Sequence, residues 1–213
     1  MQCYYICLYR SNIVGKTEKP RRTQAERRAQ SRQAVLDSAC RLFGEKGYAD
    51  TSLEEISADC GLTIRPVYHY FGNKKSLFAA VNEHMSARIL DTFVSDMGED
   101  PEKALRVSWR AFLDLCDDPG FRRVVLIDGP NILGRQQWAQ STIYLRASEL
   151  VGATQPTRGA AKKFRFALMN RVMMGAMAEA ALMVAEADDI PMAKREAEQL
   201  IMTMFARLGD YSG

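Results

Sequence analysis

One face of the segment from Thr63 to Phe71 carries side chains that can form hydrogen bonds with a nucleic acid. When the apolar positions of this segment are assigned to a buried side, four residues remain outside: Arg65, Pro66, Tyr68 and His69. An arginine can donate two parallel hydrogen bonds to guanine, and Tyr68 and His69 can reach phosphates or base edges. These residue types favour recognition of DNA, and the alternative is an ordinary helical hairpin with a solvated face.

The flanking sequence predicts two short helices around a tight turn that would position this face. The first is capped by Thr51-Ser52, with Glu55 completing a capping box, and it ends at Gly61. Thr63 caps the second. Each helix has an apolar inner side at helical spacing: Leu53, Ile56 and Cys60 in the first, and Ile64, Val67 and Phe71 in the second. This arrangement is typical of a helix-turn-helix, whose second helix lies in the DNA major groove.

The rest of the chain also follows a helical repeat and shows no alternating strand pattern. Gly129-Pro130 is expected to break one apolar run. The expected helices are those that end at Gly47, begin after Asn73 and at Pro101, and span residues 136–151, 160–187 and 190–208. The predicted fold class is all-α, with a three-helix N-terminal domain and a larger helical C-terminal domain.

Composition excludes several classes of protein. With 47% hydrophobic and 26% charged residues, the chain can bury a core. The apolar run from Val172 to Ala185 contains Glu179, so no transmembrane helix is expected. Residues 1–88 hold 14 Lys and Arg against 9 Asp and Glu, whereas residues 89–213 hold 15 against 17. A basic first part suggests a polyanion-binding module, and the alternative is a basic tail that aids solubility.

No catalytic or metal-binding pattern is present in the sequence. The two histidines, His69 and His84, fall on different predicted helices, and there is no HExxH, GxSxG, GxGxxG or Walker A run. The five cysteines are scattered without a CxxC pair, which argues against a zinc site or a disulfide framework and fits a reducing cytoplasm. We therefore expect no enzyme, no metal and no cofactor.

The run from Arg32 to Ala80 resembles the DNA-binding domain of the TetR family of bacterial transcriptional regulators. About fifty contiguous residues match in order and spacing. The matching pieces are Leu42-Phe43 with Gly47-Tyr48, Thr51-Ser52, Glu55-Ile56, Cys60-Gly61-Leu62, the run from Val67 to Phe71, Asn73-Lys74 and Leu77.

The resemblance implies a homodimer that binds a palindromic operator in double-stranded DNA. It divides the chain into a flexible basic extension (1–24), the helix-turn-helix domain (25–72) and a helical regulatory and dimerisation domain (73–213). The DNA-contacting residues carried over by position are Thr51, Ser52, Thr63, Arg65, Pro66, Tyr68, His69 and Lys74. Capping alone is the alternative role for Thr51, Ser52 and Asn73, and a solvated position is the alternative for Lys74.

One residue departs from the family pattern. Pro66 stands where family members often have a small hydroxyl residue that contacts the DNA backbone. Proline is tolerated in a first helical turn, so the helix is expected to form without that contact. The basic extension is either an arm that contacts the backbone or minor groove, or a disordered tail.

The C-terminal half resembles the family only loosely. Candidate ligand-binding residues are Trp109, Phe112, Trp138, Tyr144, Asn170, Met173 and Met177, with Arg171 as a second polar anchor. Candidate dimer-interface residues on the last two helices are Ala176, Ala180, Leu200, Ile201, Met204 and Leu208. The alternatives are that the methionines simply fill the core and that these helices complete a monomer.

We therefore predict a cytoplasmic dimeric repressor that a small apolar or amphipathic effector releases from its operator. A TetR-like activator, or a regulator that responds to a protein partner, is the alternative. The sequence identifies neither the effector nor the operator.

Overall fold

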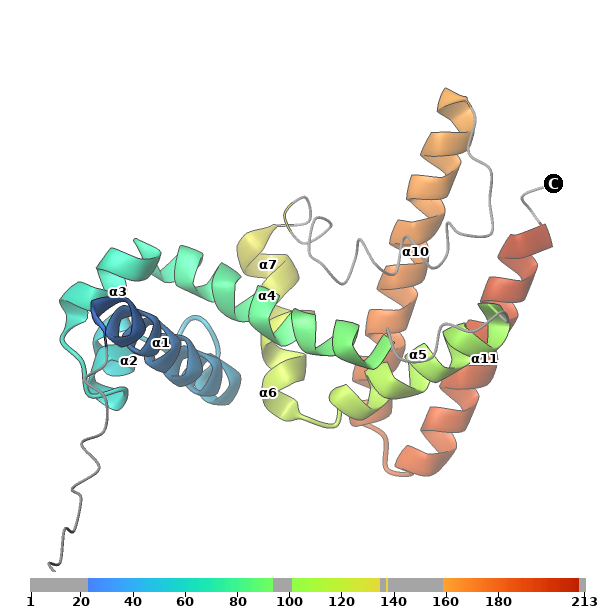
Figure 1. Ribbon diagram of the computed structural model, residues 1–213. Coiled ribbons are helices and arrows are strands. Elements are labelled where there is room, and N and C mark those ends of the chain that lie inside the picture. The colour runs from blue at the N-terminus through green and yellow to red at the C-terminus, as the bar shows by residue number, and fades with distance from the viewer. Residues whose placement is uncertain (1–22, 94–100, 135–136, 138–158, 211–213) are drawn as a thin grey trace, which may run out of the picture.

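The computed structural model describes residues 23–93, 101–134, 137 and 159–210, and within these residues the chain is helical and has no strand. The first three helices gather at one end of the molecule, and α4 leads from them toward the long helices at the other end (Figure 1). This agrees with the all-α class and with an N-terminal three-helix unit followed by a helical C-terminal part.

The first three helices are α1 (Gln24–Lys46), α2 (Leu53–Asp59) and α3 (Ile64–Phe71). Thr23 caps α1 in a complete capping box: its hydroxyl accepts from the Glu26 N–H, and the Glu26 carboxylate accepts from the Thr23 N–H at 2.7 Å. The basic stretch is therefore helical from Gln24 onward. Residues 1–22 lie outside the described part.

An aromatic cluster closes the core of this N-terminal unit. Phe43 and Phe78 are fully buried and meet edge to face, with ring centroids 5.2 Å apart. Tyr48 stacks on Phe43 at 5.9 Å and meets Phe78 at 5.1 Å. Burial of a side chain of this size stabilises a fold by about 1.5–3 kcal/mol, and edge-to-face contacts add to it. Phe78 belongs to α4 (Lys74–Phe93), so this cluster joins α4 firmly to α1.

The middle of the chain forms α5 (Pro101–Leu115), α6 (Pro119–Phe121), η2 (Arg122–Asp128) and α7 (Gly129–Leu133). Pro101 is the first residue of α5, as predicted. Gly129-Pro130 does not interrupt the helical structure, contrary to the expected break. Gly129 has helical backbone angles, and η2 continues directly into α7. The apolar run before Gly129 is instead a π-helix, which the apolar pattern did not indicate.

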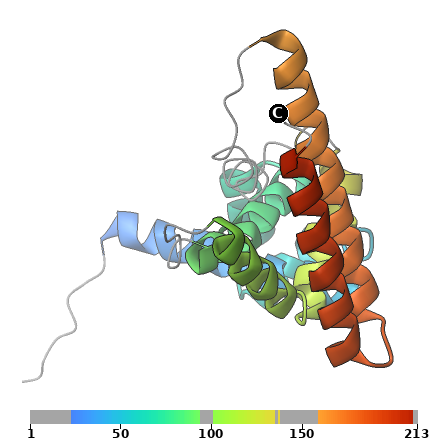
Figure 2. The ribbon, with the colours of Figure 1, turned by 90° about the vertical axis from the view of Figure 1, so that its right-hand side faces the viewer.

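Two long helices, α10 (Ala160–Ala185) and α11 (Ile190–Asp210), lie side by side at the far end (Figure 2). Both agree with the predicted ranges to within a few residues. The predicted helix over 136–151 falls almost entirely outside the described residues.

Part of α10, Lys163–Ala185, is long and apolar enough by length and composition to span a membrane. This differs from the expectation drawn from Glu179. A single such segment does not distinguish a membrane span from a helix whose apolar side packs against another protein surface.

Candidate nucleic-acid interface

The helix α3 presents its predicted recognition face to solvent. Arg65 and His69 are exposed, and Tyr68 is half exposed. Arg65 has no hydrogen bond or ion pair among the described residues, so its guanidinium is available to an incoming ligand. Thr63 caps α3 by position but makes no side-chain capping hydrogen bond, which leaves its hydroxyl available as well.

The opposite side of α3 holds the helix against the domain. Val67 is buried, as the apolar spacing predicted. Ile64 and Phe71 are only partly buried at the edge of the core. The guanidinium carbon of Arg32, on α1, lies 5.1 Å from the centroid of the Phe71 ring, an arrangement that favours a cation–π contact. The buried stripe therefore fixes which face of α3 points outward.

The supporting helix α2 is capped by Ser52, whose hydroxyl accepts from the Glu55 N–H at 3.0 Å. The predicted capping box is incomplete, because the Glu55 carboxylate forms an ion pair with Lys46 at the end of α1. Thr51 is buried, and its hydroxyl donates to the carbonyl of Gly47 at 2.8 Å. This corrects the prediction for Thr51, since its side chain fastens the loop between α1 and α2 and faces away from solvent.

Lys74 stands at the start of α4 beside this loop. Its Nζ donates to the carbonyl of Ala49 at 3.2 Å and lies 4.4 Å from the centroid of the Tyr48 ring. Asn73 caps α4, because its side-chain oxygen accepts from the Ser76 N–H at 2.8 Å. A positive side chain thus sits next to a helix N-terminus, a combination that attracts phosphate.

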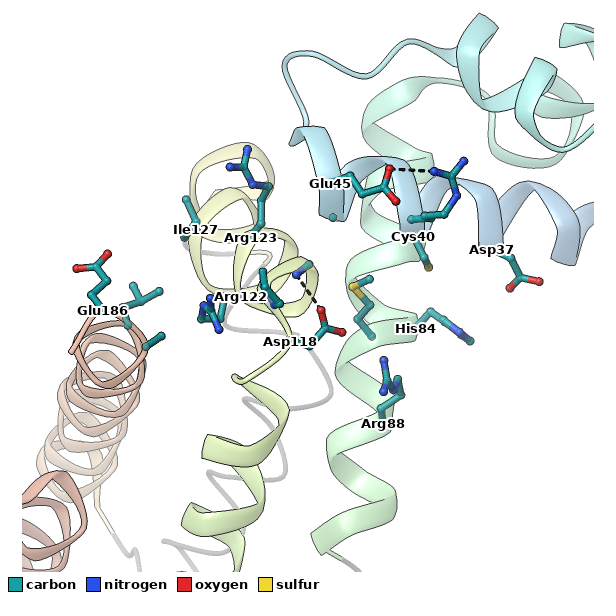
Figure 3. Close-up of a pocket in the computed structure, with 17 residues that line it drawn as sticks. Asp37, Cys40, Glu45, His84, Arg88, Asp118, Arg122, Arg123, Ile127 and Glu186 are labelled. Carbon is teal, nitrogen blue, oxygen red and sulfur yellow. Dashed lines mark hydrogen bonds and ion pairs between the residues drawn. The ribbon is translucent and has the colours of Figure 1, made fainter. Parts of the chain in front are cut away.

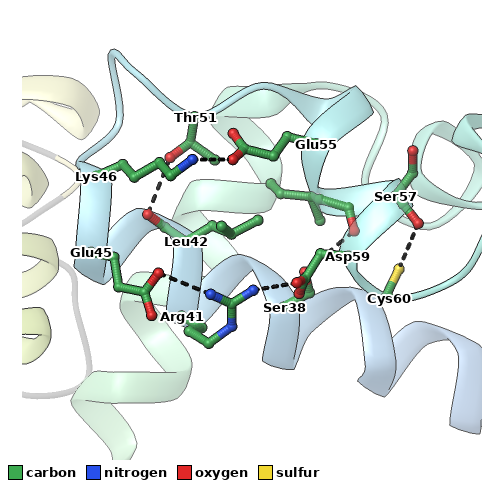
Figure 4. Close-up of polar contacts among 11 residues, drawn as sticks. Ser38, Arg41, Leu42, Glu45, Lys46, Thr51, Glu55, Ser57, Asp59 and Cys60 are labelled. Carbon is green, nitrogen blue, oxygen red and sulfur yellow. Dashed lines mark hydrogen bonds and ion pairs between the residues drawn. The ribbon is translucent and has the colours of Figure 1, made fainter.

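A charged network joins α1 to α2 behind the recognition face (Figure 4). The Ser38 hydroxyl donates to Asp59 at 2.6 Å, and Arg41 forms ion pairs with both Asp59 and Glu45. The hydrogen bond from Ser38 is the main cause that lowers the pKa of Asp59 below its ordinary value, and Arg41 adds to it. The network fixes α2 against α1, and α3 packs on both of these helices.

An open groove of about 800 Å³ runs along the junction between the N-terminal unit and the rest of the chain (Figure 3). Its walls come from α1, α4, α6–η2 and the end of α10. Both polar and apolar side chains line it, among them Cys40, Met85, Arg122, Ile127 and Leu182. Burial raises the pKa of the Cys40 thiol to about 11, so this thiol is protonated at neutral pH.

The predicted ligand-binding residues differ in their burial. Trp109, Phe112, Asn170 and Met173 are buried. Three buried polar atoms in this half have no hydrogen-bond partner among the described residues: Ser86 Oγ, Trp109 Nε1 and Asn170 Oδ1. Met177 is half buried, whereas Arg171 is exposed and does not face the core. Trp138 and Tyr144 lie outside the described residues.

The predicted dimer-interface residues do not share one exposed face. Ile201 is buried within its own chain, and Ala176, Ala180 and Met204 are partly buried against the same core. The prediction that Ile201 faces a partner subunit is therefore wrong. Ala176, Ala180 and Met204 leave only part of their surface free for a partner. Leu200 is more than half exposed, as an interface residue should be. The side chain of Leu208 is outside the described part.

Sequence reasoning missed the apolar residues that do face solvent on α10. Phe164, Leu168, Val172 and Met183 are each more than half exposed. The first three recur every four residues, so a helical-face analysis could have identified them as a stripe. Among the described residues, no group of His, Cys, Asp or Glu is arranged to hold a metal ion.

Two family models match this chain. One, described as bacterial regulatory proteins of the tetR family, matches residues 35–81. The other, described as the tetracyclin repressor-like C-terminal domain, matches residues 103–208. The first covers the second half of α1, then α2, α3 and the start of α4, and the second covers most of the C-terminal half.

Individual relatives agree with these models. The chain is 34% identical over 103 residues to the transcriptional repressor AcnR of Corynebacterium efficiens, across 43% of this chain and 54% of that protein. It is 33% identical over 86 residues to the transcriptional repressor NicS of Pseudomonas putida, across 39% and 40% of the two chains. The matched part thus spans about half the length of these curated relatives or less.

Solved structures extend the likeness to nearly the whole chain. A TetR-family transcriptional regulator from Pectobacterium atrosepticum aligns with a TM-score of 0.57 and 28% identity, over 86% of this chain and 95% of that one. A regulator described as a member of the same family, from Shewanella, aligns with a TM-score of 0.64 over 82% and 95% of the two chains, and at 18% identity it supports the fold alone.

Proposed function

Because this chain belongs to the tetR family of bacterial regulatory proteins, we propose that it is a DNA-binding transcriptional repressor that works as a homodimer. A small apolar or amphipathic effector releases it from its operator. It is not an enzyme, and as a regulator of bacterial genes it acts in the cytoplasm.

The observation that carries the proposal is the outward face of α3. Arg65 is exposed and has no partner among the described residues, while Val67 on the other side is buried. An unpaired arginine beside Tyr68 and His69 supplies the donors that read base edges in the major groove. Ser52 and Lys74 lie at the N-termini of α2 and α4, where they contact the phosphates on either side.

Dimerisation is supported by the solvent-facing stripe on α10. Phe164, Leu168 and Val172 lie at four-residue intervals, and an exposed apolar patch of this kind marks an interaction surface. Packing α10 and α11 of two subunits together covers these residues in a four-helix bundle. Two α3 helices then meet successive major grooves about 34–36 Å apart.

Effector binding is supported by the unpaired polar atoms in the C-terminal core. Trp109 Nε1 is a donor and Asn170 Oδ1 is an acceptor, and a buried polar atom without a partner costs about 1–3 kcal/mol. An effector with an apolar body and a hydrogen-bonding group would satisfy either atom that it reaches. The effector favours the arrangement of subunits that does not fit the operator, so operator DNA must weaken effector binding by the same factor.

A gel-shift titration with the DNA upstream of the protein's own gene tests this function. We expect specific binding that survives competition by random DNA at moderate salt, and equal affinity for both DNAs would contradict the proposal. Reporter expression in a deletion strain separates the alternatives. Increased expression means a repressor, and lost expression means a TetR-like activator.

A further inference from the structure

Specific contacts between the DNA-binding unit and the regulatory half lie beside the open groove (Figure 3). At one point the backbones of α1 and α6 touch: a Cβ added to Gly44 would lie 3.0 Å from the Cα of Gly120. At another point, two side chains of η2 form hydrogen bonds with backbone groups at the end of α1. These contacts add directional hydrogen bonds to the apolar core that α1 shares with α6 and η2.

These hydrogen bonds involve the backbone groups on either side of Gly47. The Tyr48 N–H donates to Asp128 Oδ2 at 2.9 Å, and Arg123 Nη1 donates to the Lys46 carbonyl at 3.3 Å. A Cβ added to Gly47 would lie 2.8 Å from Arg123 Nη1 and 3.4 Å from Asp128 Oδ2. Both side chains therefore converge on one spot, and Gly47, with a φ of 84°, leaves room for them.

The π-helical form of η2 explains how these two side chains reach the same spot. Arg123 and Asp128 are five residues apart. In an α-helix, residues five apart point about 140° away from each other. In a π-helix the hydrogen bond runs from residue i+5 to residue i, as it does here from the Gly129 N–H to the Val124 carbonyl, so residues five apart lie on one face.

The helix α4 holds η2 in this register. Asn82 is buried on α4, and its Nδ2 donates to the carbonyl of Val124 at 3.1 Å. The same carbonyl accepts the π-helical hydrogen bond. Gly129 fits closely here, since a Cβ added to it would lie 2.7 Å from Asn82 Nδ2 and 3.0 Å from the Val124 oxygen. The helix that bears Lys74 at its start thus also sets the register of η2.

We propose that Arg123 and Asp128 are positioning residues that fix the angle between the DNA-binding unit and the regulatory half, and that the π-helical register of η2 brings them together. Conversion of η2 to an α-helix would rotate Asp128 away from Tyr48 and release α1. The inference rests on the proposed function, because the angle matters for DNA only when two recognition helices must match two half-sites.

The contact itself can be tested without DNA, by hydrogen–deuterium exchange of the Tyr48 N–H in the full chain. Asp128→Ala is expected to speed this exchange by about tenfold or more. Asp128→Asn keeps an acceptor oxygen and should restore most of the protection. If exchange is unchanged in Asp128→Ala, or if Asp128→Asn behaves like Asp128→Ala, the assignment of this residue is wrong.

The positioning role is tested by operators whose half-sites are moved apart or together by one or two base pairs. Wild-type protein should prefer one spacing. Asp128→Ala should lose about tenfold in affinity at that spacing, bind the shifted operators more evenly, and bind an isolated half-site like wild type. Gly129→Ala, which crowds Asn82 and Val124, should act in the same direction.

Arg122→Ala is the matched control, because Arg122 also lies on η2 but donates to the Cys116 carbonyl within the regulatory half. It should keep the wild-type spacing preference. Equal loss at half-site and full operator in Asp128→Ala would indicate general destabilisation and overturn the inference. If wild-type protein shows no operator preference at all, the proposed function fails, and the exchange measurement still decides whether Asp128 holds Tyr48.

Discussion

The ammonium group of Lys74 lies 4.4 Å from the centre of the Tyr48 ring, so the first residue of α4 is held against the loop that follows α1. Tyr48 in turn packs on Phe43 and Phe78 and donates its N–H to Asp128. One residue therefore touches a proposed phosphate-binding lysine, the core of the DNA-binding unit and the regulatory half.

Replacing Lys74 is expected to weaken binding to all DNA sequences alike. A lysine at a helix N-terminus contacts phosphate and carries no sequence information. Lys74→Ala should lower affinity for operator and random DNA by similar factors. In gel shifts over a range of salt, the slope of log affinity against log salt concentration should become shallower by about one. Lys75→Ala, the exposed neighbour, should have the smaller effect; the reverse order would refute the assignment.

Replacing Arg65 should change preference as well as affinity. Loss of its forked donor is expected to cost about 1–3 kcal/mol at one base pair, while affinity for random DNA changes little. Arg65→Lys keeps the charge but not the paired hydrogen bonds, so it should retain more overall affinity than Arg65→Ala and still lose preference. Binding to a panel of single-base operator variants measures this. An unchanged preference in both variants would exclude Arg65 from base reading.

A charge on the exposed stripe of α10 should separate the subunits. Val172→Asp places a carboxylate in the proposed apolar interface, where it would be buried without a partner. We expect a shift from dimer to monomer at micromolar concentration in sedimentation velocity, with helicity retained. Ile127→Asp is the control, since Ile127 is similarly exposed but lies on η2. A monomeric wild type, or dissociation by both variants, would rule out this interface.

Acid should loosen the junction of α1 and α2 through Asp59. Its pKa is lowered by the hydrogen bond from Ser38 and by Arg41, from an ordinary value of 3.8. Its contribution to stability is therefore present above that value and is lost as the pH falls through the lower pKa of the folded state. Asp59→Asn should lose less stability than wild type between about pH 4 and pH 2, measured by urea unfolding.

The cause of this pKa shift can be checked separately. Ser38→Ala removes the largest contribution and should raise the Asp59 pKa toward its ordinary value in a carboxyl NMR titration. A pKa that stays where it was would show that Arg41, and not Ser38, controls the carboxylate.

Local sequence was sufficient for the helices and for the outward face of α3. The caps at Ser52 and Asn73 and the helix end at Gly47 are where the residue types predict them. Helical hydrogen bonds join residues four apart, so caps and apolar spacing carry the information that forms them. The same spacing determined which side of α3 is buried, and with it the exposure of Arg65.

Only the tertiary structure decided how groups far apart in the chain meet. Thr51 turns inward, Glu55 pairs with Lys46, and Ile201 is buried in its own subunit, although its spacing suits an interface equally well. The contact of Tyr48 with Asp128 spans 80 residues and depends on a π-helix that apolar spacing does not reveal. Periodicity specifies that a helix has an apolar side, but which neighbour covers that side is settled by the packing of the whole chain.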